Sequence, residues 1–163
     1  MTIILKNKET LIFEDFKFRC CIGKNGITNN KIEGDKKTPK GIFSLGNVYY
    51  RKDRNFLPLS KLKFTSIKKQ MGWCNDIKNK KYNKLVKIDK KIRHEKLFRK
   101  DNKYDFLIPI KYNTKNTKAG RGSAIFLHLT KNYKPTAGCI AINKKDFLIL
   151  LKIINKKTKI KIN

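Results

Sequence analysis

The apolar residues of this chain occur in short runs, and turn-forming residues separate one run from the next. Most runs alternate imperfectly between apolar and polar residues or are briefly apolar throughout, which is typical of strands that pack on another layer. The Gly, Pro and Asn residues between the runs supply the unusual φ values and side-chain caps that turns require. We therefore predict a mainly β (α+β) fold with strands over residues 2–5, 11–22, 41–50, 106–112, 123–129, 139–142 and 158–162.

One segment near the C-terminus has helical rather than alternating periodicity. Asn143 is a favourable N-cap, Asp146 follows it in the first turn, and apolar residues recur at helical spacing as far as Ile154. This pattern predicts a helix over residues 143–154.

The middle of the chain, residues 59–101, has the weakest pattern. We interpret it as one or two short helices around Ser60–Gln70 and a long loop through Lys78–Lys91. No internal repeat and no Pro- or Ser-rich linker divides the sequence. A length of 163 residues suits one domain, so we expect a single domain over residues 1–163.

The chain is strongly basic, with 41 Lys and Arg residues against 12 Asp and Glu residues and a formal net charge of +29. An excess of this size favours nucleic acid, anionic membranes or acidic polymers as partners. The cations are nearly all Lys and are scattered through every segment, whereas nucleic-acid-binding proteins concentrate Arg and Lys on one face. We expect weak polyanion affinity and no specific nucleic acid, and a basic polyanion- or nucleic-acid-binding module remains the alternative.

The four cysteines are Cys20, Cys21, Cys74 and Cys139, and they form no CxxC pair and have no His at zinc-ligand spacing. We therefore expect no metal and no cofactor. Cys20 and Cys21 are adjacent in an extended segment, so their side chains point to opposite faces and are poorly placed to bond each other.

The N-terminal segment shows no ordered pattern of basic start, long apolar stretch and small-residue cleavage site. No segment approaches the ~20 apolar residues of a membrane-spanning helix. We expect a soluble monomer with no transmembrane segment.

One pair of residues, a histidine and a cysteine, has the chemistry of a nucleophilic active site. His128 ends an apolar strand eleven residues before Cys139, and a turn with Pro135 and Gly138 separates them, so two neighbouring strand ends would bring an imidazole against a thiol. An adjacent imidazole raises the reactive fraction of a thiol whose ordinary pKa is about 8.5. Gly138 permits a sharp turn, and the amides of Gly138 and Cys139 would form an oxyanion hole. A buried core cysteine is the alternative interpretation.

These residues resemble the catalytic signature of the YkuD-type L,D-transpeptidase family. The signature is a His, a spacer, then Ser or Thr, any residue, Gly and Cys, which here is His128 followed by Thr136-Ala137-Gly138-Cys139. A second stretch, Glu33–Phe43, is similar to the family's Gly/Asp turn and Thr-Pro-x-Gly-x-Phe motif. The resemblance runs from about Arg19 to the C-terminus and implies a β-sandwich of mixed sheets with a few short helices, one of them after the cysteine.

The resemblance also implies a reaction. Cys139 would attack the third residue of a peptidoglycan tetrapeptide stem and release D-Ala, leaving a thioester. An amine of a neighbouring stem would complete a 3→3 cross-link, or water would make the protein an L,D-carboxypeptidase. His128 would act as base and then acid, oriented by the carbonyl of Leu129. The family implies the cell envelope or periplasm. Because no export signal is visible, an upstream start, an unusual export route or a different substrate all remain open.

Two residues depart from the common family pattern, which has His or Asn at the position of Ala137 and Arg at that of Ala141. Arg121 and Arg99 are candidates for the substrate contact that this Arg would make, and a surface or structural cation is the alternative interpretation of each. Thr136 either positions the catalytic turn or donates a hydrogen bond to substrate.

Two further residues belong to the expected groove. Trp73 is interpreted as core or as a wall of the substrate groove. His94 is the second histidine, and we interpret it as a structural or groove residue rather than a catalytic one. A catalytically inactive relative with a structural role is the remaining alternative.

Overall fold

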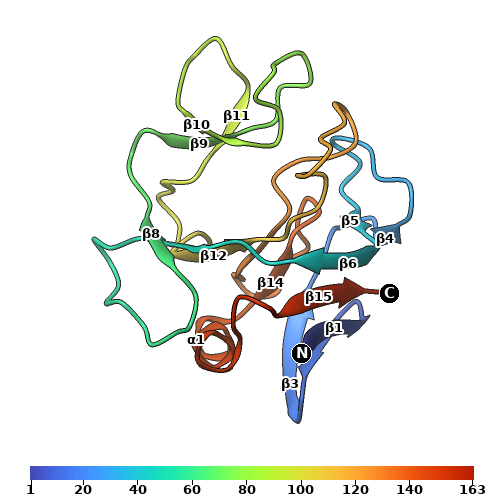
Figure 1. Ribbon diagram of the computed structural model, residues 1–163, viewed down its shortest axis with the longest axis vertical. Coiled ribbons are helices and arrows are strands. Elements are labelled where there is room, and N and C mark those ends of the chain that lie inside the picture. Colours follow the sequence, from blue (N-terminus) through green and yellow to red (C-terminus); the bar gives the residue numbers. More distant parts are fainter.

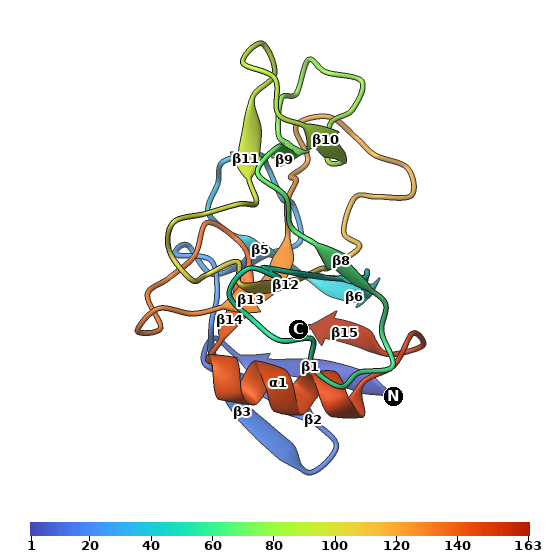
Figure 2. The same cartoon turned by 90° about the vertical axis from the view of Figure 1, so that its left-hand side faces the viewer.

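A computed structural model describes residues 1–163, and a mixed sheet of ten strands dominates it (Figures 1 and 2). The strands lie in the order β6-β15-β1-β2-β3-β14-β13-β12-β7-β8. Their bounds are β1 Thr2–Asn7, β2 Thr10–Phe13, β3 Phe16–Cys21, β6 Gly41–Ser44, β7 Val48–Tyr50, β8 Phe64–Ser66, β12 Phe106–Pro109, β13 Phe126–Leu129, β14 Ile140–Ile142 and β15 Lys159–Ile162. Three neighbouring pairs, β1 with β15, β7 with β8 and β13 with β14, are parallel.

The sheet curls until strands distant in its order meet. Leu45, directly after β6, forms an isolated bridge with Ile110, directly after β12. The amide of Gly46 also donates to the Pro109 carbonyl at 2.8 Å. The result is a half-barrel whose concave side encloses a core of 25 buried apolar residues.

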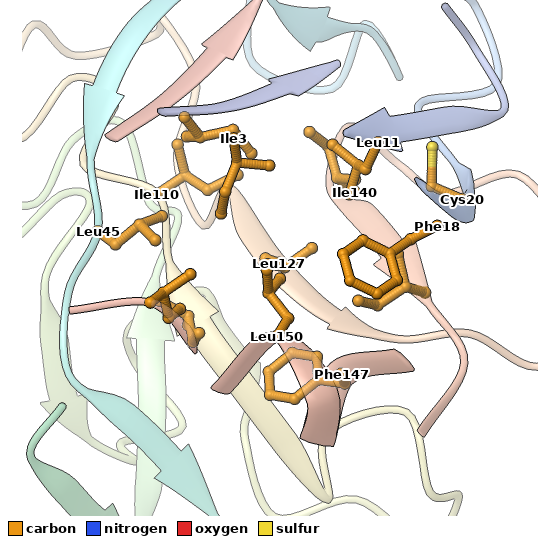
Figure 3. Close-up of a cluster of buried hydrophobic side chains, with 14 of the residues drawn as sticks. Ile3, Leu11, Phe18, Cys20, Leu45, Ile110, Leu127, Ile140, Phe147 and Leu150 are labelled. Carbon is orange, nitrogen blue, oxygen red and sulfur yellow. The ribbon is translucent and has the colours of Figure 1, made fainter. Parts of the chain in front are cut away.

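The helix α1 (Lys144–Ile153) covers one side of this core. Figure 3 shows Phe147 and Leu150 of α1 pointing toward Leu127 of β13, Ile140 of β14 and Phe18 of β3. Each of these side chains is at most 3% exposed, so α1 closes the core beneath the two strands that carry His128 and Cys139.

The predicted helix near the C-terminus is confirmed. Asn143 is its N-cap, and the Asn143 side chain accepts a hydrogen bond from the Asp146 amide at 2.8 Å. Asp146 lies in the first turn, where a carboxylate favours the helix dipole. The helix ends at Ile153, one residue before the predicted end.

Two small sheets accompany the large one. A three-stranded antiparallel sheet contains β9 (Met71–Cys74), β10 (Leu85–Lys87) and β11 (His94–Lys96), and it lies at the top of Figure 1. A parallel pair contains β4 (Ile27–Thr28) and β5 (Thr38–Pro39). A second cluster of eight buried residues, among them Trp73, Leu97, Phe126 and Cys139, links the three-stranded sheet to the strands of the half-barrel.

The structure confirms the mainly β fold class and corrects several predicted elements. The helices expected around Ser60–Gln70 are wrong, because residues 64–66 form β8, which pairs with β7. The single strand predicted over residues 11–22 is two strands, β2 and β3. Glu14, between them, has φ 52°, which turns the chain into a hairpin. The strands β9 to β11 were not predicted.

Candidate active site

The parallel pairing of β13 with β14 places His128 and Cys139 on one face of the sheet. His128 lies opposite Ala141, and Cys139 stands two residues before Ala141. Side chains two residues apart in an extended chain point to the same face. Both side chains accordingly line the same cavity, which has a volume of about 360 Å³.

The thiol of Cys139 is enclosed, with the residue only 7% exposed. Its Sγ donates to the Ala124 carbonyl at 3.2 Å and accepts from the Phe126 amide at 3.3 Å. Burial, followed by the charge of Glu95, raises the pKa of Cys139 to about 12, while the hydrogen bond from the Phe126 amide opposes the shift. The resting thiol is therefore protonated at neutral pH.

The imidazole of His128 is held in a defined tautomer. Its Nδ1 lies 2.8 Å from the Leu129 carbonyl, which can only accept, so Nδ1 carries the proton and Nε2 is left with a free lone pair. This is the orienting contact expected for Leu129. Burial lowers the pKa of His128 to about 4, although the bond to Leu129 opposes the shift. His128 is thus a neutral base at physiological pH.

Tyr104 and Glu95 form a buried polar pair beside the imidazole. The Tyr104 ring meets the His128 ring edge to face, with centroids 5.2 Å apart, and its hydroxyl donates to the Glu95 carboxylate. Burial raises the pKa of Glu95, and the hydrogen bond from Tyr104 opposes this. Both residues line the cavity that contains Cys139. Sequence reasoning assigned a functional role to neither residue.

The turn before Cys139 is held by the hydroxyl of Thr136. Its Oγ1 donates to the Cys139 carbonyl at 2.6 Å and accepts from the Gly138 amide at 3.1 Å. The Cys139 amide donates to no acceptor within the protein. Of the two amides expected to form the oxyanion hole, that of Cys139 is open and that of Gly138 is engaged by Thr136.

The upstream motif supports this turn. Gly138 has φ +140°, and a Cβ there would lie 2.9 Å from the Lys37 carbonyl oxygen. Next to Lys37, the Thr38 hydroxyl accepts from the Gly23 amide at 2.9 Å, and Gly23 bridges to Thr136. The two sequence motifs therefore meet in space, which explains why they occur together.

A second group to which sequence reasoning assigned no role also lines this cavity and includes Lys31 and Glu33. Lys31 is only 4% exposed, and its ammonium pairs with the Asp35 carboxylate. The Glu33 carboxylate accepts from the Tyr82 hydroxyl and from Ser123 Oγ at 2.7 Å. The Gly34-Asp35 turn within the upstream motif was the nearest signal in the sequence.

The four residues predicted for substrate binding fall into two groups. Thr136 and Arg99 line the cavity, and Arg99 forms a two-point ion pair with Asp101 while lying 5.1 Å from the Tyr104 ring centroid. Arg121 lies outside it, where its Nη1 donates to the Asn30 side-chain oxygen at 2.7 Å.

Trp73 also lies outside this cavity, packed edge-on against Phe126 at 5.1 Å. Its Nε1 donates to the Asn83 side chain at 3.0 Å, which satisfies the indole within the core. His94 lies in β11 and covers Gly72, with Nδ1 close to the Ile92 carbonyl. The structure brings neither residue to the thiol.

No group of three or more His, Cys, Asp or Glu side chains is arranged to hold a metal ion. The structure contains no helix of the length and apolarity needed to cross a membrane.

The fold and the site define a β protein in which a buried histidine on β13 and a buried cysteine directly before the parallel strand β14 line one cavity. The sequence profile of the YkuD family, described as the L,D-transpeptidase catalytic domain, matches residues 1–162. The chain therefore belongs to the YkuD family, and the match begins earlier than the resemblance at Arg19 implied. Comparisons with curated proteins and with solved structures found no match to this chain.

Proposed function

We propose that this protein is a peptidoglycan L,D-transpeptidase whose nucleophile is Cys139. The observation that carries the proposal is that Cys139 and a neutral His128, whose Nδ1 is bonded to the Leu129 carbonyl, line one cavity in a chain of this family. The protein would work in the cell envelope, where members of the family generally act.

Acylation would begin with Cys139 as a neutral thiol and His128 as a neutral imidazole. The S–H bond points to the Ala124 carbonyl in this structure, and rotation about Cβ–Sγ would redirect it. As Sγ bonds to the carbonyl carbon of the third stem residue, the thiol proton would pass to Nε2 of His128. The bond to the terminal D-Ala then breaks, and the proton on Nε2 passes to the departing amine. A thioester on Cys139 remains.

Deacylation would use the same groups. An amine of a second stem attacks the thioester, gives a proton to His128, and receives the acyl group as the Cys139 thiol re-forms. Water in place of the amine gives carboxypeptidase activity. The open amide of Cys139 would stabilise the oxyanion in both halves.

A cationic wall would bind the carboxylates of the donor stem. Ala141 lines the cavity where the common family pattern has an Arg, and Arg99 and Lys103 line the same cavity. We propose that Arg99 replaces the missing Arg. Its pairing with Asp101 would fix the orientation of the guanidinium.

The test is incubation with a diaminopimelate-containing tetrapeptide stem, measuring released D-Ala and cross-linked dimer by mass spectrometry. Wild type is expected to release D-Ala, and Cys139→Ser is expected to lose this activity. Cys20→Ser is the matched control, because Cys20 is a buried thiol outside the cavity. Folded wild-type protein that yields neither D-Ala nor dimer would refute the proposed reaction.

A further inference from the structure

The loop between β7 and β8, residues 51–63, presents apolar side chains to solvent. Phe56 is 99% exposed, Leu59 78% and Leu57 62%, and no other large apolar side chain in the chain exceeds the 60% of Met1. Scattered exposed apolar residues are ordinary, but three of them within four consecutive positions form a patch that indicates a docking surface.

Hydrogen bonds from Arg51 and Arg54 attach the base of this loop to residues 99–101. Arg51 Nη1 donates to the Arg99 carbonyl at 2.6 Å, and its other guanidinium nitrogens pair with Asp53. Arg54 donates to the carbonyls of Lys100 and Asp101, each at 3.0 Å. These bonds hold the residues just before the apolar tip, which consists of Phe56, Leu57 and Leu59, and the tip projects outward from this base.

Positive charge surrounds the apolar tip. Lys52 precedes it, Lys61 and Lys63 follow it, and all three are exposed. The one acid of the loop, Asp53, is neutralised by its pairing with Arg51.

The helix α1 adds further cations on this side of the molecule. In both Figure 1 and Figure 2 the loop runs past α1. Lys144 of α1 donates to the Asn55 side-chain oxygen at 2.8 Å, and Lys156 lies beside Leu62 and Lys63 at a second cavity. Lysines of the loop, of α1 and of the segment after α1 therefore flank the apolar side chains of Phe56, Leu57 and Leu59.

We propose that loop 51–63 docks this protein onto the surface of an anionic lipid bilayer. The side chains of Phe56, Leu57 and Leu59 enter the boundary between headgroups and acyl chains, while the surrounding lysines contact lipid phosphates. The net charge favours an anionic bilayer over a second copy of the chain as the partner, because two molecules of net charge +29 repel each other. The interaction is independent of the proposed transpeptidase reaction.

The test is co-sedimentation with vesicles of phosphatidylglycerol and phosphatidylcholine, compared with vesicles of phosphatidylcholine alone. Wild type is expected to bind the anionic vesicles, and F56S/L57S/L59S to bind about tenfold more weakly because the apolar insertion is lost. The matched control is I32S/I42S/I77S, which removes three apolar side chains that are 51–59% exposed elsewhere on the surface. The control is expected to bind like wild type.

Insertion is tested separately by Phe56→Trp with brominated lipids, which quench only tryptophans that enter the bilayer. Emission from the introduced tryptophan is expected to fall, whereas that of the buried Trp73 in wild type is not. The proposal is overturned if the loop and control variants bind equally, if wild type does not prefer anionic vesicles, or if the introduced tryptophan is not quenched. It is also overturned if the wild type sediments as a dimer that F56S/L57S/L59S abolishes, since the tip would then cover a second copy.

Discussion

Replacing Thr136 with Val tests how the catalytic turn is held. The substitution keeps the branched shape and removes the hydroxyl, which in the structure donates to the Cys139 carbonyl at 2.6 Å and accepts from the Gly138 amide at 3.1 Å. Each such hydrogen bond contributes about 0.5–1.5 kcal/mol net. Thr136 is partly exposed, so water compensates in part, and we expect a loss of about 1–2 kcal/mol in the free energy of unfolding.

The measurement is thermal and urea unfolding combined with steady-state kinetics. A loss of this size lowers the melting temperature of a chain of this length by about 2–8 °C. Thr136→Ser, which keeps the hydroxyl, is expected to stay near wild type. In Thr136→Val, kcat is expected to fall with little change in KM, because the turn that carries the nucleophile is loosened. Unchanged stability together with a raised KM would refute this reasoning and assign the hydroxyl to substrate binding.

Three further predictions concern the reactive pair and its turn. The rate at which iodoacetamide alkylates Cys139, measured by peptide mass, should rise about tenfold per pH unit from pH 7 to 9, because the pKa of this thiol is raised to about 12. A rate that does not depend on pH would indicate a preformed thiolate–imidazolium pair. His128 has a folded pKa of about 4 against an ordinary 6.5, so its stabilising effect is present above pH 6.5 and lost as pH falls through 4. Urea unfolding should show wild type losing about 3 kcal/mol more than His128→Asn over that range, and equal losses would contradict the shift. Gly138→Ala should abolish turnover and lower the melting temperature, since its Cβ meets the Lys37 oxygen at 2.9 Å; near-wild-type activity would show that the turn relaxes freely.

The parts of the fold that were predictable depend on local signals. The cap at Asn143 and the periodicity after it define α1 without any distant contact. The strands β9 to β11 have no such signal. For example, β11 is His94-Glu95-Lys96, a polar tripeptide that becomes a strand only because it pairs with β9. Because the paired residues are twenty or more positions apart in the sequence, no local pattern predicts this strand.

The candidate site also contains some residues that were predictable from the sequence and others that were not. The placement of His128 and Cys139 at one cavity was predictable, because the Thr136-Ala137-Gly138-Cys139 signature marks the cysteine and both residues lie at neighbouring strands. The Tyr104 and Glu95 pair was not, because these residues reach the cavity from separate segments and no local pattern indicates that they meet. For Trp73 the sequence left core and groove wall open, and the structure packs its indole in the core, where Nε1 donates to Asn83.

The most direct test of Cys139 as the nucleophile is acylation by a carbapenem-type β-lactam, read by intact mass and by mapping of the modified peptide. The structure predicts one covalent adduct on the peptide that contains Cys139, because this thiol and His128 line the same cavity. The adduct should be lost in Cys139→Ser and retained in Cys74→Ser, which alters a fully buried thiol away from the cavity. An adduct that persists in Cys139→Ser, or folded wild-type protein that forms none, would contradict the assignment.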